Sequence, residues 1–220
     1  MQITIDVIVD VITQGDVAQA ILDAAEREEV SLIVMGARGI NPIKELLLGS
    51  VSSAVLRHAK TSVLVLHSGA GAVTGKTLPA ASSQRLFFRV LAPTDFSSHA
   101  EDALSFIKKI PGIEEVILLH VVTRVQSLPE IEAAVAEAQA QLEKTKKDFE
   151  GKVTMITARI RVGDPADMIV SVAEEDRASL IAMNAFGTDW LREMLLGSTT
   201  FTVVRRTKNP VLVIRMPQGT

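Results

Sequence analysis

The sequence has no cysteine, few aromatic residues and no long apolar run. Without cysteine the chain cannot form disulfides or use thiol chemistry, and this composition is typical of a cytoplasmic protein, which is the location we expect. No apolar run approaches the roughly 18 residues of a membrane helix, and no signal-peptide pattern is visible. We therefore expect neither a membrane nor a secreted environment.

Excess positive charge is also missing. The 220 residues carry a formal net charge of −3 and no basic stripe, so nucleic acid is not an expected partner. Hydrophobic residues make up 47% of the chain but aromatic residues only 4%, so the core must consist of Ala, Val, Ile and Leu. This composition suits parallel strands covered by helices, and the length allows one large domain or two small ones.

A repeat organises the chain. Residues 15–67 align without a gap on residues 163–215, at a constant offset of 148, with 23 of the 53 pairs identical. "LLGS" occurs in both copies, at 47–50 and 195–198. A duplication explains this agreement far better than chance.

Each copy reads as strand, helix, strand, helix, strand. Residues 3–11 and 153–162 are rich in β-branched residues, and the Gly-Asp pair that follows each predicts a helix capped by Asp16 or Asp164. A short apolar strand, a helix after the Gly-Ser pair and a Val-rich strand complete each copy. Strands that alternate with helices predict a parallel sheet with right-handed crossovers.

The second copy has more sequence in front of the shared part. Residues 86–96 and 114–122 read as strands, 97–110 as a helix, and Ser127 opens a capping box before a long helix. We therefore predict an incomplete domain at 1–67, a linker at 68–85 and a complete five-stranded domain at 86–216. Below, residues 1–67 are the first copy and residues 86–216 the second copy.

The stretch "AGAVTGKT" (70–77) resembles a phosphate-binding P-loop. A P-loop must open a helix at its Lys-Thr pair, but here Pro79 follows and no helical periodicity is visible. The surrounding Gly, Ala, Ser and Thr favour a flexible linker.

The loop after the fourth strand is a better candidate for anion binding. It carries Gly36, Gly39, Gly49 and Ser50 in the first copy, and Asn184, Gly187, Gly197 and Ser198 in the second. Glycine allows backbone N–H groups to approach an anion, and a serine cap would place a helix N-terminus beside it. Such a loop lies at the carboxyl end of a parallel strand, where open α/β sheets bind ligands. The spacing alone fits ordinary turns equally well.

The pattern G-x2-G-x9-G-[S/T], together with "VLAPTDFSSHAEDAL" (90–104) and "EEVILLHVV" (114–122), resembles the universal stress protein family over nearly the whole chain. The resemblance implies an α/β fold with a doubly wound open parallel sheet of strand order 3-2-1-4-5, like the adenine nucleotide alpha hydrolases. It also implies tandem copies or dimers, and, in a subset of members, binding of ATP or AMP in stress responses without a dedicated reaction.

Carried over by position, the resemblance implies a nucleotide site in the second copy. Asp95 would contact the ribose or adenine, since a carboxylate accepts from hydroxyl and amine groups, and Val121 would offer backbone groups to the adenine edge. The glycine loop and helix start would take the phosphates, with or without Mg²⁺. The full predicted set is Pro93, Thr94, Asp95, Val121, Met183, Asn184, Gly187, Gly197, Ser198 and Thr199.

Two departures weaken this site. Asn184 replaces the first glycine of the signature; because asparagine tolerates positive φ, we expect the turn to survive, with a side chain that could crowd the phosphates. The first copy keeps a phosphate half-site, formed by Gly36, Gly39, Gly49, Ser50 and Val51, but has no counterpart of Asp95 or Val121.

The alternative to nucleotide binding is a family member that works through protein contacts and dimerisation. An adenylating ligase would need a Ser-Gly-Gly or His-x-Gly-His motif, which "APTDFSSH" lacks. We therefore predict no dedicated enzyme activity, without excluding weak ATP hydrolysis. The four histidines show no metal-ligand spacing, and His120, in an apolar strand, is expected in the core.

The final strands, 62–66 and 210–214, match each other in sequence. Family resemblance implies that such strands pair between copies or subunits. We therefore expect either an intrachain pseudo-dimer or a homodimer through these strands.

Overall fold

The computed structural model describes residues 7–9, 16–38, 48–67, 86–123, 127–186 and 196–216. The predicted linker at 68–85, with its P-loop-like stretch, lies outside these residues.

Within the described residues, helices and strands alternate along both copies. The first copy contains α1 (Val17–Arg27), β1 (Leu32–Gly36), α2 (Ser50–His58) and β2 (Ser62–Leu66). The second copy contains β3 (Arg89–Pro93), α3 (Ser98–Ile107), β4 (Glu115–Val122), α4 (Leu128–Lys147), β5 (Met155–Val162), α5 (Pro165–Glu175), β6 (Leu180–Asn184), α6 (Ser198–Arg206) and β7 (Val211–Ile214).

Side-chain caps begin several of these helices. The Asp16 carboxylate accepts from the Ala18 N–H at 2.9 Å, and the Asp164 carboxylate accepts from the Asp167 N–H at 3.0 Å. The Ser127 hydroxyl accepts from the Glu130 N–H at 3.4 Å, which places it at the start of α4. The three predicted N-caps are therefore confirmed.

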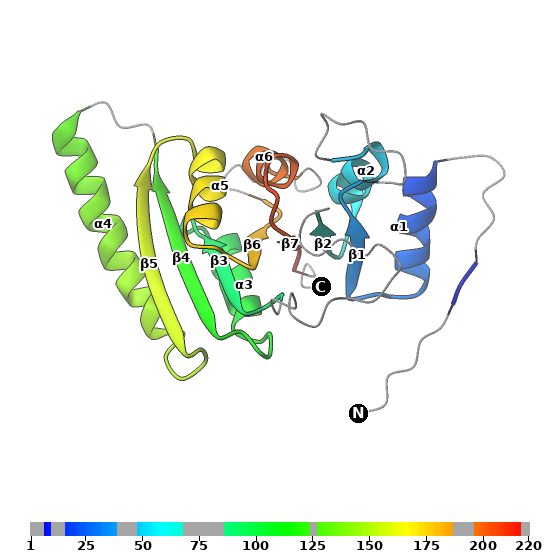
Figure 1. The fold of residues 1–220 in the computed structure, drawn as a ribbon, viewed down its shortest axis with the longest axis horizontal. Coiled ribbons are helices and arrows are strands. Elements are labelled where there is room, and N and C mark those ends of the chain that lie inside the picture. The colour runs from blue at the N-terminus through cyan, green and yellow to red at the C-terminus, as the bar shows by residue number, and fades with distance from the viewer. Residues whose placement is uncertain are drawn as a thin grey trace.

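The seven strands form one sheet in the order β1-β2-β7-β6-β3-β4-β5. Numbered within the second copy, its own five strands follow the predicted order 3-2-1-4-5, and all of their pairings are parallel. Figure 1 shows the first copy at one end of the molecule and α4 at the other. The predicted doubly wound sheet is confirmed.

The two copies meet through their last strands. β2 pairs antiparallel with β7, and Leu64 lies opposite Leu212, its own counterpart at the offset of 148. Val63 and Val65 pair with Val213 and Val211 in the same crossed fashion. A local pseudo-two-fold axis thus passes between Leu64 and Leu212, and the expected intrachain pairing is confirmed.

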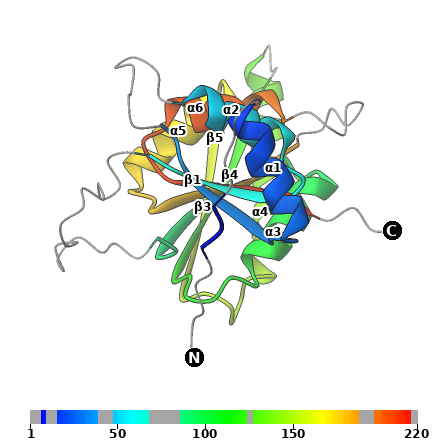
Figure 2. The same ribbon diagram turned by 90° about the vertical axis from the view of Figure 1, so that its right-hand side faces the viewer.

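The core is divided by the sheet into two apolar clusters. One cluster lies under α1, α2, α5 and α6 and runs through both copies without a break, with Val55, Val63, Val203 and Val213 among its fully buried members. The other cluster lies against α3 and α4 and belongs almost entirely to the second copy, with Leu64 as its one buried member from the first copy's described residues. Figure 2 views the molecule from the first-copy end, with α1 and β1 toward the viewer.

Polar contacts across the pseudo-two-fold axis add to this packing. His67 follows β2, and its Nε2 lies 2.9 Å from the Val204 carbonyl near the end of α6. Arg215 is the equivalent residue after β7, and its guanidinium donates to the Leu56 carbonyl of α2 at 3.0 Å. Each copy therefore supplies a hydrogen bond to a carbonyl in the last turn of the other copy's helix. Carbonyls in the last turn of a helix receive no hydrogen bond from within that helix.

The predicted strand at 3–11 is not formed at the residues that the structure describes. Val7, Ile8 and Val9 are exposed and take part in no strand, and the remaining residues of that prediction lie outside the described part of the chain. In the second copy β3 and β4 separate the equivalent strand, β5, from β6, and neither has a counterpart among the described strands of the first copy.

We predict that residues 1–67 fold only against the second copy. Expressed alone, residues 86–216 should be soluble and melt cooperatively, because both faces of their five strands keep their helices. Expressed alone, residues 1–67 should be unfolded or aggregated, because β2 loses β7, one of its two partner strands, and the shared cluster loses most of its buried members. Circular dichroism and sedimentation of the two fragments provide the test. A cooperatively melting monomer of residues 1–67 would contradict the prediction.

We predict that His67 makes the free energy of unfolding depend on pH. Burial lowers the pKa of His67 below its ordinary value of 6.5, partly opposed by its bond to the Val204 carbonyl. The folded state then binds fewer protons than the unfolded state just below pH 6.5, so stability should decline as the pH falls through this value and be constant above it. Denaturant titrations should show this decline in the parent protein and a smaller one in His67→Gln, which retains an N–H donor.

The exposed His58 provides the matched control for that measurement. His58→Gln should leave the pH dependence unchanged. An equal decline in the parent protein and in His67→Gln would show that another group causes it.

Candidate functional site

The described residues among those predicted for the second-copy site lie at or near the carboxyl edge of the sheet. β3 lies between β4 and β6 and is parallel to both, so the ends of the three strands meet at one edge. Pro93 is the last residue of β3, Asn184 is the last residue of β6, and Val121 lies one residue before the end of β4. The turn from β3 into α3 therefore lies between the other two strand ends.

This turn holds Asp95 at the surface. Thr94 is buried, and its N–H donates to the Leu119 carbonyl at 2.8 Å, which continues the ladder between β3 and β4. Asp95 is exposed, and its Oδ1 accepts from the N–H of Ser97 at 3.1 Å and from its hydroxyl at 2.6 Å. Ser97 is itself the N-cap of α3, so the Asp95 carboxylate is oriented toward the start of that helix.

Phe96 gives the turn an unusual backbone. Its φ is +59°, a left-handed conformation that a bulky residue rarely adopts, because it costs free energy and persists only where the surrounding contacts hold it. Its ring stacks on His120 with 4.5 Å between centroids, and the His120 Nδ1 lies 2.9 Å from the Thr94 carbonyl. Because a carbonyl only accepts, Nδ1 carries the proton. His120 is half-buried at the site rather than in the core, so its predicted location was wrong.

Hydrogen bonds close the base of the loop that follows β6. The Ala185 N–H donates to the Ile214 carbonyl at 3.0 Å, and the Gly197 N–H donates back to the Ala185 carbonyl at 2.8 Å. The buried Thr200 hydroxyl donates to the Asn184 carbonyl at 2.9 Å. We call this set of three bonds the loop clamp; it fixes the start of α6 beside the end of β6.

The first copy repeats the loop clamp at equivalent positions. The Ala37 N–H donates to the Leu66 carbonyl and the Gly49 N–H to the Ala37 carbonyl, both at 2.7 Å. The Ser52 hydroxyl donates to the Gly36 carbonyl at 2.9 Å. The phosphate half-site predicted for the first copy thus has the same framework as the one in the second.

The helices after these loops begin one residue earlier than expected. Gly49 and Gly197 are the N-caps of α2 and α6, and neither helix has a side-chain cap. Ser50 and Ser198 are the first helical residues, so the prediction that they act as caps was wrong. The first N–H groups of each helix have no acceptor within the helix, and such groups are the ones with which helix N-termini bind anions.

Asn184 does not adopt the positive φ that we expected at this position. Neither Asn184 nor Gly36 has positive φ, so the first position of the signature requires no left-handed turn in this structure. A Cβ at Gly36 would lie 3.3 Å from the Arg38 carbonyl, a close contact. Asn184 carries a Cβ, and its amide donates to the equivalent carbonyl, that of Phe186. The asparagine side chain therefore binds the start of the loop.

The remaining predicted residues fall into three groups. Met183 is buried in the shared cluster, so only its backbone could face a ligand, and Val121 packs against the same cluster. Val51 and Thr199 are half-buried in the first turns of α2 and α6. Gly39 and Gly187 lie outside the described residues.

Aromatic and cationic groups near this edge were not identified from the sequence. Phe186 meets His99 in an edge-on contact with 6.1 Å between centroids, and the Arg215 guanidinium stands 5.2 Å from the Phe186 ring. The repeat alignment contains one indication of this difference between the copies, because Phe186 occupies the position that Arg38 has in the first copy.

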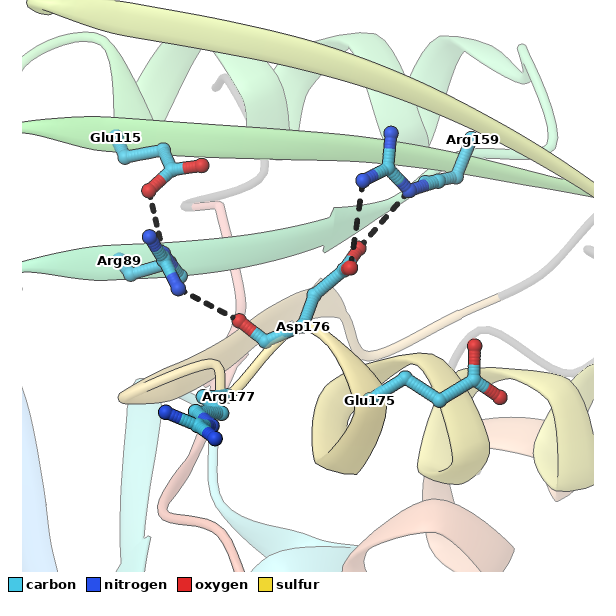
Figure 3. A pocket seen from close by; sticks show the side chains of 6 residues that line it. All are labelled: Arg89, Glu115, Arg159, Glu175, Asp176 and Arg177. Atoms are coloured by element: carbon cyan, nitrogen blue, oxygen red, sulfur yellow. Dashed lines mark hydrogen bonds and ion pairs between the residues drawn. The ribbon is translucent and has the colours of Figure 1, made fainter.

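A charged pocket lies elsewhere on the sheet, near the amino ends of β3 and β4 (Figure 3). Arg89 pairs with Glu115 and donates to the Asp176 carbonyl at 2.9 Å, while Arg159 pairs with the Asp176 carboxylate at 3.0 Å. Because these charged groups pair with one another, we interpret the pocket as a structural ion-pair network rather than a ligand site.

Neither a metal cluster nor a membrane helix is found in the part of the chain that the structure describes. No group of three or more His, Asp or Glu side chains there could hold a metal ion. No described helix is long and apolar enough to span a bilayer.

Comparison with known proteins gives one family. The profile of the universal stress protein family matches residues 2–67 and 87–215, one match for each copy. Universal stress protein MJ0577 of Methanocaldococcus jannaschii is 33% identical over 155 residues, which cover 59% of this chain and 96% of that protein. A universal stress protein of Mycolicibacterium smegmatis is 27% identical over 217 residues, which cover 93% of this chain and 67% of that protein.

Solved structures agree with these matches. The crystal structure of a universal stress protein from Archaeoglobus fulgidus superposes with a TM-score of 0.56 at 30% identity and covers 90% of this chain. This chain spans 64% of that protein's length and about two thirds of the Mycolicibacterium relative. With the profile matched in both copies and the fold similar to that of a solved member, the chain belongs to the universal stress protein family.

Proposed function

We propose that the second copy binds an adenine nucleotide, ATP or AMP, at the carboxyl edge of its sheet. In this proposal the chain acts as a nucleotide-binding module in stress response or signalling and has no dedicated catalytic reaction. The observation that carries the proposal is the loop clamp, which holds the uncapped N-terminus of α6 beside the end of β6.

The phosphates would bind at the start of α6. The N–H groups of Ser198 and Thr199 lack acceptors within the helix, and the helix dipole adds partial positive charge at the same place. Gly197 has no side chain to obstruct an approaching phosphate. Gly187 would complete this half of the site, as the family signature implies, with Mg²⁺ as a possible counter-ion of the phosphates.

The nucleoside would bind at the turn between β3 and α3. The exposed carboxylate of Asp95 can accept from the ribose hydroxyls and would repel phosphate, which supports a separation of the two halves along the edge. Pro93 and Thr94 lead into this turn, and backbone groups near Val121 and Met183 would meet the base. The first copy, which has the loop clamp without such a turn, would contribute no complete site.

The alternative proposal is that the chain works through protein contacts. One observation favours it: the Asn184 amide is bonded to the Phe186 carbonyl, where the signature has a glycine. In this alternative, the Asn184 side chain would occupy space at the start of the loop that a glycine leaves to a phosphate. The two proposals differ in whether any nucleotide stabilises the protein.

We predict that millimolar ATP or AMP raises the melting midpoint of the chain. A ligand at 100 times its Kd adds about 2.7 kcal/mol to the free energy of unfolding, which corresponds to roughly 5–10 °C for a chain of this size. Thermal shift with and without Mg²⁺ provides the measurement. Tripolyphosphate should give a smaller shift, because it would use the phosphate half alone.

Asp95→Asn is the variant that tests the nucleoside half, since asparagine can still accept from Ser97 but lacks the charge. Asp102→Asn, at an exposed position on α3, is the matched control. The Asp95 variant should lose most of the difference between ATP and tripolyphosphate, and the control should keep it. Equal shifts from ATP and tripolyphosphate in the parent protein would contradict a nucleoside site.

We predict that Asn184→Gly increases the shift caused by ATP. Glycine removes both the Cβ and the amide, so the second copy gains the arrangement of Gly36 in the first. Asn184→Ala removes only the amide and separates its effect from that of the Cβ. If neither the parent protein nor either variant responds to nucleotide, the protein-contact alternative replaces the proposed function.

A further inference from the structure

The end of α2 lies beside the start of α6. β2 and β7 pair antiparallel, so α2 and α6, which lead into these strands in the same way, also run in opposite directions. The Arg57 guanidinium, in the last turn of α2, stands 4.1 Å from the centroid of the Phe201 ring. The Phe201 N–H closes the first turn of α6 on the Gly197 carbonyl, and a helical side chain leans toward the N-terminus of its helix. The first copy thus places a cationic side chain near the proposed phosphate site.

Arg215 connects the same end of α2 to the loop after β6. Its guanidinium donates to the Leu56 carbonyl at 3.0 Å and to the Arg57 carbonyl at 3.4 Å, and it stands 5.2 Å from the centroid of the Phe186 ring. Phe186 directly follows Ala185, which belongs to the loop clamp. The end of α2 therefore meets both sides of the clamped loop, through Arg215 on the β6 side and through Arg57 on the α6 side.

The two guanidinium groups at this place have no acidic partner among the described residues. No described carboxylate forms an ion pair with Arg57 or Arg215. Arg215 is half-buried, no described group bonds its buried Nε, and burial lowers the pKa of its guanidinium below the ordinary value. A cation that has lost part of its hydration is stabilised by a nearby negative charge. The two arginines therefore indicate an anion at this place independently of the helix N-terminus.

The repeat shows that the stacked arginine is specific to the start of α6. At the offset of 148, Arg57 corresponds to Arg205 and Phe201 corresponds to Ser53. Both copies have the arginine, but only α6 offers an aromatic face on which the arginine of the other copy can stack. Stacking uses the face of the guanidinium, and the N–H donors lie in its plane, where they can bind oxygen anions. The ring thus occurs in the copy that also carries the turn at Asp95.

The order of the strands gives a bound nucleotide a direction. Along the sheet, β3 is followed by β6, β7 and β2. The proposed nucleoside half lies at the end of β3, and the proposed phosphate half lies after β6, at the start of the helix that leads into β7. A nucleotide that spans these two halves points its outer phosphates toward β2 and the end of α2.

We propose that Arg57 of the first copy binds the outer phosphates of the nucleotide in the second copy, so that the site prefers ATP to AMP. The role of Arg57 rests on the proposed function, because it requires a nucleotide in the second copy. AMP has a single phosphate, which the N-terminus of α6 can bind alone, whereas ATP presents further oxygens to a guanidinium fork. Arg215 is a positioning residue that holds the end of α2 against the loop. The incomplete copy thereby supplies a specificity-determining residue to the complete one.

The test compares the binding of ATP and of AMP to the full chain by isothermal titration calorimetry. Arg57→Gln should weaken ATP binding by about tenfold, the loss of one charge-assisted contact, and should change AMP binding by less than about twofold. Arg57→Lys keeps the charge without the planar fork and should recover part of the ATP affinity. Arg205→Gln is the matched control, because Arg205 is the equivalent exposed arginine in the last turn of α6, and it should leave both affinities unchanged.

Failure of this role is distinguishable from failure of the proposed function. A parent protein that binds neither nucleotide would overturn both. If the parent protein binds ATP and Arg57→Gln leaves the ratio of the ATP and AMP affinities unchanged, the role of Arg57 alone is overturned. An equal loss of ATP affinity in Arg205→Gln would assign the effect to net charge and would overturn it too. Phe201→Leu keeps an apolar side chain but removes the ring, so it should lower the same ratio, and an unchanged ratio would overturn the stacked arrangement.

Discussion

Antiparallel pairing of β2 with β7 is the contact on which the rest of the architecture depends. It turns a four-element fragment and a five-stranded unit into one seven-stranded sheet. It also brings α2 and α6 close enough for His67 and Arg215 to reach each other's helices. Without it, β2 would have β1 as its single partner strand, and the apolar residues beneath α1 and α2 would lose the second copy's share of the cluster.

Much of the fold could be predicted because the elements shared by the two copies occur twice in the sequence. Local sequence determines the hydrophobic periodicity, the caps at Asp16 and Asp164, and the alternation of strands with helices. These features can therefore be read from the sequence alone. The strand predicted at 3–11 is absent at residues 7–9, the part of it that the structure describes. Its β-branched residues favour a strand, but a strand also needs neighbours, and no described strand of the first copy corresponds to β3 or β4.

The candidate site was predictable in position and less so in detail. The glycine spacing identified the loop after β6, yet the sequence did not reveal that Gly197, rather than Ser198, precedes the helix. Nor did it reveal that His120 and Phe96 stack beneath the turn that carries Asp95. These features depend on φ values and on contacts between separate strands, and residue type alone does not specify either. The Asn184 side chain shows the same limit, because residue type does not reveal that its amide donates to the Phe186 carbonyl.

One apolar cluster runs through both copies, and it makes the folding of the first copy depend on the second. The dependence is one-sided, because the second copy keeps its own five strands and the helices that cover them. A substitution that loosens the second copy's share of the cluster should therefore make the first copy more sensitive to a protease, although the altered residue lies in the other half of the molecule.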